Sequence, residues 1–283
     1  MLMPMLTFPP AMELLVLGHV TRDEIGDELR LGGAASYAAL AGARRGVPTT
    51  LVTVAPPDDP LLAPLRAEAG LTLHCAPSPV MTTFRLDYQG GRRRLALRQL
   101  ARALVPDDLP ARWRRGAAGD GAPGFGVAYV GPVAGECDRA LCAALGARFV
   151  AAGLQGWLRR AGAGGEIEPA MAPEAIDPPP LDAAILSEED HPDAEAIAAP
   201  FVAAGALVAI TRGARGATLR ASGARWEIAA APAVEVDPTG AGDVFGVVLA
   251  LALAAGKPPP EAGAAAARAA ARVVEGRWLL GEG

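Results

Sequence analysis

The sequence predicts an α/β protein with a mostly parallel central sheet, helices on both faces and a small inserted β layer. Short apolar strands alternate with alanine-rich helical stretches through most of the chain, the pattern of a parallel sheet covered by helices. One hairpin pattern interrupts this alternation. The chain has 283 residues, of which 51% are hydrophobic, so it can bury a large core.

The strands and helices follow from local patterns. Strands are expected where four to six apolar or β-branched residues end at glycine or a polar turn. Helices are expected where alanine-rich stretches begin after a loop and stop at glycine. The expected strands are 13–18, 49–54, 127–131, 148–152, 183–186 and 206–211, and the expected helices are 34–45, 61–69, 136–145 and 244–255.

The hairpin lies in residues 82–97. Residues 82–88 alternate at period two, Gln89-Gly90-Gly91 forms the turn, and 92–97 returns. A short strand around 29–31 is expected to join it. We therefore expect one domain, residues 12–283, with β segments inserted at about 21–32 and 80–98. Residues 161–180 are rich in Gly and Pro and predict a loop.

Composition excludes several classes of protein. The net charge is −5, which disfavours a nucleic-acid partner. The one lysine, Lys257, precedes proline, so there is no Walker A loop. No Gly-x-Gly-x-x-Gly follows the first strand, which disfavours a dehydrogenase.

Three cysteines form no disulfide framework. Residues 1–12 lack the basic start of a signal peptide, and the longest apolar run is too short for a membrane span. These features predict a soluble cytoplasmic protein without a membrane partner.

The segment 237–243 reads Asp-Pro-Thr-Gly-Ala-Gly-Asp and precedes an apolar helix. Glycines at a helix start leave the first backbone N–H groups bare, and together with the helix dipole these suit an anion such as phosphate. Asp243 would lie in the first turn, where its carboxylate could accept a proton from a substrate hydroxyl. The alternative is an ordinary loop in which Asp243 caps a buried helix.

The string from Asp237 to Phe245 resembles the C-terminal signature of the ribokinase-like (PfkB) carbohydrate kinases. Gly32-Gly33 resembles the di-glycine motif of that family, and 211–217 resembles its Thr-x-Gly-x-x-Gly nucleotide loop. The hairpin sits where the family has its substrate lid. The resemblance runs from about Leu14 to Gly276. It implies a ribokinase-like doubly wound fold and ATP-dependent phosphorylation of a hydroxyl on a sugar, polyol or nucleoside.

The resemblance also implies roles for individual residues. Asp243 would be the catalytic base, and Gly240, Ala241 and Gly242 the anion hole. The nucleotide would contact Thr211, Gly213, Gly216 and Ser187. The substrate hydroxyls would be held by Asp23, Gly32, Gly33 and Tyr37. Asp190 and Glu189 would hold Mg²⁺, and a monovalent cation would lie near Asp237 and Thr239.

Three positions depart from the family pattern. Tyr37 stands where many members have the Asn that contacts the sugar. The Asn-x-x-Glu magnesium region reads Ser187-Glu188-Glu189-Asp190, so Asn has become Ser. Pro238 restricts Asp237 to an extended backbone in the cation loop.

Several local strings look more like the myo-inositol kinase branch than ribokinase itself. They are 31–37 with its aromatic residue, Thr82-Thr83-Phe84, 130–136, Gln155-Gly156-Trp157-Leu158-Arg159 and 236–240. Two alternatives stay open: a nucleoside kinase in which Tyr37 stacks on a base, and a non-catalytic ligand-binding or regulatory protein on the same fold. A lid sheet with an open edge also predicts a homodimer formed through the lid.

Overall fold

A computed structural model of the chain describes residues 8–89, 92–116, 126–170 and 176–277. Its centre is a nine-stranded sheet in the order β15-β14-β13-β12-β9-β8-β1-β4-β5. The strands from β5 to β13 pair in parallel, and β14 and β15 add an antiparallel edge. Their bounds are β1 Glu13–Leu17, β4 Thr49–Ala55, β5 Leu71–Pro77, β8 Gly126–Val130, β9 Phe149–Gly153, β12 Ala183–Ser187, β13 Leu207–Thr211, β14 Ala217–Ala221 and β15 Ala224–Ile228.

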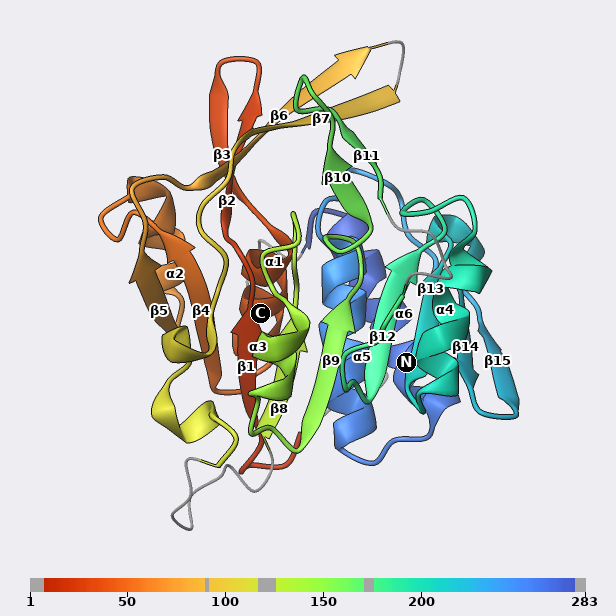
Figure 1. Cartoon of the computed structure of the whole chain (residues 1–283). Helices are drawn as coiled ribbons and strands as arrows, with labels where there is room; N and C mark the ends of the chain where they lie inside the picture. Colours follow the sequence, from red (N-terminus) through yellow and green to blue (C-terminus); the bar gives the residue numbers. More distant parts are fainter. Residues whose placement is uncertain (1–7, 90–91, 117–125, 171–175, 278–283) are drawn as a thin grey trace.

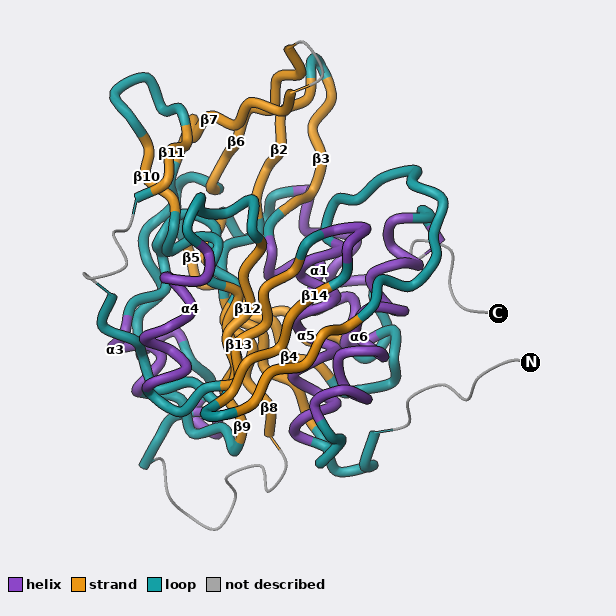
Figure 2. The backbone as a smooth tube through the Cα atoms, turned by 90° about the vertical axis from the view of Figure 1, so that its right-hand side faces the viewer, coloured by secondary structure: helices purple, strands orange, loops and turns teal. Residues whose placement is uncertain are grey.

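Helices cover both faces of this sheet (Figures 1 and 2). The helices α1, α2, α5 and α6 share one buried core with the sheet, and α3 and α4 each pack on the opposite face. Because both faces are covered, the central strands are apolar throughout rather than alternating. The helix bounds are α1 Ala34–Ala43, α2 Ala63–Ala67, α3 Arg139–Ala143, α4 Ala194–Ala203, α5 Ala241–Ala254 and α6 Pro259–Val274.

A four-stranded lid sheet in the order β3-β2-β6-β7 projects beyond the carboxyl ends of the parallel strands (Figure 1). Its strands are β2 Thr21–Ile25, β3 Glu28–Gly32, β6 Thr82–Gln89 and β7 Arg92–Gln99. Phe84 and Leu86 are buried beneath it against Ala34 and Val133. The predicted fold class and inserted hairpin are therefore confirmed, while the Gly90-Gly91 turn lies outside the described residues.

The structure differs from the predicted elements in one region that matters for the site. Part of the expected loop 161–180 belongs to a small hairpin, β10 Arg159–Ala161 with β11 Ile167–Pro169. Its strands have three residues each and little apolar content. The lid edge supports them, because Leu97 N–H donates to Gly165 O at 2.8 Å.

Among the described residues, no helix is long and apolar enough to cross a membrane.

Candidate active site

The predicted anion loop lies where α5 begins, at the carboxyl ends of the parallel strands, as expected for a ligand site in an open α/β sheet. Gly240 has φ +82°, in the left-handed region that favours glycine. A Cβ at Gly240 would also collide with the Tyr37 ring. Glycine therefore lets the start of α5 pack directly against α1, bringing the anion loop beside the di-glycine motif.

The loop leaves backbone donors open. The Ala241 N–H donates to Pro238 O at 3.1 Å, so the turn itself uses that amide. No acceptor within the described residues engages the N–H groups of Gly242 and Asp243. No side chain caps α5, so these amides and the positive end of the helix dipole offer a site for an anion. Asp243 is therefore not the N-cap of the alternative interpretation.

Asp243 lies in the first turn of α5 and remains partly exposed. Burial raises the pKa of Asp243 to about 7. The positive charge of Arg159 acts in the opposite direction, and the negative charge of Asp190 adds to the rise. A carboxyl group with a pKa near neutrality can both take and release a proton at physiological pH.

Asp190 is the second carboxylate that acts on Asp243 electrostatically. Its Oδ1 accepts from Gln155 Nε2 at 3.0 Å, and its Oδ2 accepts from the Ser187 N–H at 2.8 Å. Glu189 is exposed. The described residues contain no group of three or more metal-ligating side chains. One or two carboxylates with substrate phosphates are a common magnesium site, so Asp190 fits such an ion held jointly with a phosphorylated donor.

The predicted nucleotide loop follows β13. Thr211 ends the strand, and Gly213 and Gly216 have φ +53° and +86°, values that favour glycine. A Cβ at Gly216 would collide with the Ile228 carbonyl of β15. The side chain of Arg212 is held by Glu195 and Thr218. The loop is thus shaped by close backbone packing, next to Ser187 at the end of the paired strand β12.

The predicted substrate residues meet at the lid base. Asp23 lies on β2, where Thr21 Oγ1 donates to its Oδ1 at 2.7 Å. A Cβ at Gly32 would collide with the Asp23 carboxylate, and one at Gly33 (φ +93°) with His19 O. The two glycines therefore allow the carboxylate and the start of α1 to approach each other.

His19 is part of the lid base. Its Nε2 lies 2.9 Å from Arg102 O, and its Nδ1 lies 2.7 Å from Thr82 Oγ1. Burial lowers the pKa of His19, so the neutral ring donates from Nε2 and accepts at Nδ1. The buried Glu136 carboxylate accepts from the N–H groups of His19 and Val133 at 2.9 and 3.0 Å. These bonds hold together the segments that join the central sheet to the lid.

Sequence reasoning did not assign Tyr129, Gln155 and Arg159 to the site. Tyr129 Oη lies between Gly153 and Gly246, where added Cβ atoms would contact it. Burial and the carboxylates of Asp243 and Asp190 raise the pKa of Tyr129 well above its ordinary value. Gln155 and Arg159 follow the carboxyl end of β9. Ligands bind at the carboxyl ends of parallel strands, so this position in the sequence could have indicated that both residues belong to the site.

Comparisons with known proteins agree with this geometry. Residues 181–277 match the pfkB family of carbohydrate kinases. A search of curated proteins gives no match. The family resemblance is therefore confirmed on the segment that carries the nucleotide and anion loops, and members of this family are phosphotransferases that act on hydroxyl groups.

Solved structures share the fold over nearly the whole chain. A pyrophosphate-dependent kinase of the ribokinase family, complexed with a pyrophosphate analogue and myo-inositol, has a TM-score of 0.74 at 18% identity and covers 92% of this chain and 94% of its own. Ribokinase from Thermotoga maritima gives 0.68 at 19%, with 93% of each chain covered. Fructokinase from Vibrio cholerae, bound to fructose, ADP and calcium, gives 0.66 at 18% with the same coverage. These matches establish the ribokinase-like fold.

Proposed function

We propose that this chain, whose segment 181–277 belongs to the pfkB carbohydrate kinases, transfers the terminal phosphoryl group of ATP to a hydroxyl of a sugar or polyol. The observation that carries the proposal is the start of α5. There a partly exposed carboxyl group with a pKa of about 7, Asp243, adjoins the open amides of Gly242 and Asp243 itself.

In this mechanism the acceptor hydroxyl lies between the lid and α5. As its oxygen forms a bond to the terminal phosphorus, the bond from phosphorus to the bridging oxygen breaks, and the leaving group keeps that electron pair. The hydroxyl proton passes to the Asp243 carboxylate. A loose phosphoryl-transfer transition state requires little of the base, so positioning and the open amides supply most of the rate. Magnesium held by Asp190 would neutralise donor phosphate charge.

The acceptor site suits a polyhydroxylated molecule. Asp23 presents a carboxylate fixed by Thr21, and the di-glycine backbone lies against it. Carboxylates are strong acceptors for hydroxyl donors. Within the sugar and polyol class we propose myo-inositol, because the sequence strings around Tyr37 and Gln155 resemble that branch and because one structural neighbour was complexed with myo-inositol.

The same neighbour is pyrophosphate-dependent, so pyrophosphate must be tested as a donor beside ATP. The proposed monovalent cation would lie at the Asp237-Thr239 turn, where Thr239 N–H donates to Asp237 Oδ1 at 2.9 Å. The homodimer through the lid and the cytoplasmic location also stay predictions.

The test is a panel measurement. The purified chain is given magnesium with ATP or pyrophosphate and, in turn, myo-inositol, ribose, fructose, adenosine and cytidine, and acceptor-dependent ADP or phosphate release is followed. We expect one strong acceptor among the polyols and sugars, and loss of most turnover in Asp243→Asn. A nucleoside as the strong acceptor would favour the nucleoside kinase, with Tyr37 re-examined as a base contact. Donor-induced stabilisation without turnover would favour the non-catalytic binding protein.

A further inference from the structure

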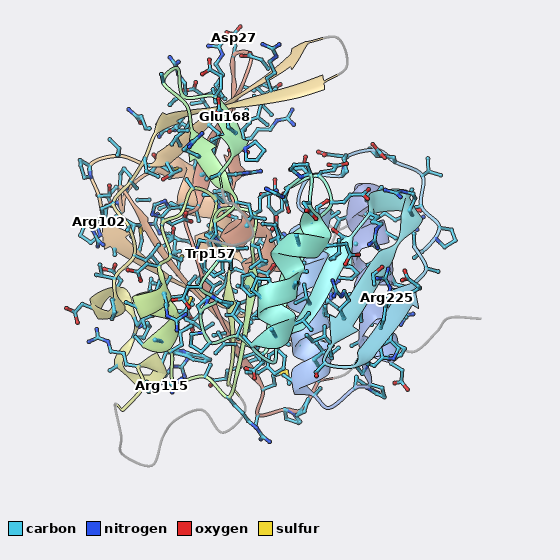
Figure 3. The ribbon with its side chains drawn as sticks, turned by 45° about the vertical axis from the view of Figure 1, so that its right-hand side comes forward. Asp27, Arg102, Arg115, Trp157, Glu168 and Arg225 are labelled. Atoms are coloured by element: carbon cyan, nitrogen blue, oxygen red, sulfur yellow. The ribbon has the colours of Figure 1, made fainter. Side chains whose placement is uncertain are left out.

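The β10–β11 hairpin carries two neighbouring arginines on opposite faces. Residues paired across an antiparallel ladder share a face, and successive residues alternate. Arg160 pairs with Glu168, and their side chains form an exposed ion pair at 3.3 Å. Glu168 lies high on the molecule, near the lid (Figure 3). Arg159 shares the other face with Ile167, since Ala161 pairs with Ile167.

That second face is directed under the lid. Ile167 packs against the lid core that contains Phe84 and Leu86, and Arg159 is half-buried whereas Arg160 is exposed. Arg159 therefore lies on the inner side of the hairpin, between the lid and the carboxyl end of β9.

Contacts at both ends fix the hairpin. At its tip, Leu97 N–H donates to Gly165 O at 2.8 Å, and Glu166 forms a β-bridge with Ala96 of β7. At its base, a Cβ at Gly156 would collide with the Pro132 backbone. Figure 1 shows β10 rising from the end of β9 to the lid. The backbone that bears Arg159 is therefore held in place at both ends of the hairpin.

The positive charge of Arg159 acts electrostatically on Asp243, the proposed catalytic base. It acts on Asp243 in the direction that lowers the pKa. An arginine placed only to serve the base would weaken it, because a nearby cation reduces the proton affinity of a carboxylate. A cation at this position suits an anion that binds there during the reaction. The amides of Gly242 and Asp243 supply donors for the same anion from α5.

We propose that Arg159 is a catalytic residue that binds the terminal phosphoryl group of the donor from the lid side, opposite the open amides of α5. The inference rests on the proposed kinase function and adds a specific group to it. Guanidinium groups match phosphate oxygens in a bidentate fork, and charge on these oxygens is what a phosphoryl-transfer site must stabilise. The proton still passes to Asp243, so Arg159 takes no part in proton transfer.

The experiment compares Arg159→Ala with the matched control Arg160→Ala, its neighbour on the outer face. With the best acceptor from the panel, we expect Arg159→Ala to lower kcat about 100-fold with little change in the KM of the acceptor. Arg160→Ala should stay within about twofold of wild type, since exposed ion pairs contribute little. Equal kcat values for the two variants would overturn the proposal.

A binding measurement separates this inference from the kinase function. Titration calorimetry with inorganic pyrophosphate and magnesium needs no acceptor and no turnover. Loss of one charged hydrogen-bonding group should weaken pyrophosphate binding about tenfold or more in Arg159→Ala and leave it unchanged in Arg160→Ala. Equal affinities, or no binding by the wild-type chain at millimolar pyrophosphate, would overturn the role of Arg159. If no acceptor in the panel supports turnover but Arg159→Ala still binds pyrophosphate more weakly than the wild type, the proposed kinase function would be rejected and the phosphate contact of Arg159 would be retained. If the alanine variant fails to fold, Arg159→Gln carries the same test.

Discussion

Replacing Asp243 by Asn should change the pH dependence of stability as well as turnover. In the folded chain the pKa of Asp243 is about 7, against an ordinary value of 3.8. Between these values the folded state holds a proton that the unfolded state has released, so unfolding becomes easier as pH rises. The difference of about 3 pH units corresponds to about 4 kcal/mol of lost stability above pH 7, at about 1.4 kcal/mol per unit. Asn is neutral and nearly isosteric, so Asp243→Asn should avoid this loss.

The assay is urea unfolding of both proteins at several pH values from about 5 to 8.5. Other titrating groups, His19 included, cancel in the difference between the two proteins. We expect Asp243→Asn to exceed the wild type by about 1.6 kcal/mol near pH 5 and by about 4 kcal/mol near pH 8, while turnover falls at least about 100-fold. Asp237→Asn, in the same loop but exposed, should leave the curve unchanged. A difference between wild type and Asp243→Asn that does not vary with pH would refute the explanation that desolvation raises the pKa of Asp243.

Three further outcomes follow from the geometry. Gly240→Ala should cost about 1–3 kcal/mol of unfolding free energy, because it places a Cβ at positive φ and against Tyr37; Gly242→Ala, with open space around it, is the control, and equal losses would contradict the packing argument. Burial lowers the pKa of His19 from 6.5, so the wild type should lose stability as pH falls below about 6.5 while His19→Gln should not; urea titrations that stay parallel at all pH values would contradict this. Leu29, exposed on the lid edge strand β3, should support the predicted dimer, so Leu29→Lys should shift the mass seen by light scattering from dimer to monomer, and an unchanged mass would reject this interface.

The sequence predicts six of the nine strands of the central sheet, because these are largely apolar and end at glycine or polar turns; β5, β14 and β15 were not predicted. Because helices pack on both faces, these strands have few alternative arrangements that would bury their side chains. It also places Asp243 correctly, since a helix start after Gly-Ala-Gly leaves few positions for its carboxylate. The strand β2 was expected only as part of the lid segment at about 21–32 and not as a strand with its own bounds, because Thr-Arg-Asp-Glu-Ile has no strand-like alternation and pairs only with β3 and β6.

The contribution of β10 and β11 could not be read from sequence for a similar reason. Arg159 and Arg160 are adjacent and chemically identical, and only the register with 167–169 assigns them to opposite faces. That register depends on the lid edge, about 65 residues earlier in the chain. The effect of Asp190 and Arg159 on Asp243 likewise depends on three segments that meet only in the folded protein.

The contact between Gly240 and Tyr37 has a consequence for how the protein is made in the cell. On the ribosome, α1 emerges about 200 residues before α5, a delay of about 10–40 s at ordinary synthesis rates. During that interval the alanine-rich face of α1 and the strands beneath it lack the helix that covers them. The nascent chain therefore leaves the apolar face that α5 covers exposed until α5 has been synthesised. Chaperone capture during synthesis, and rapid degradation of chains that stop short of α5, are the expected cellular consequences.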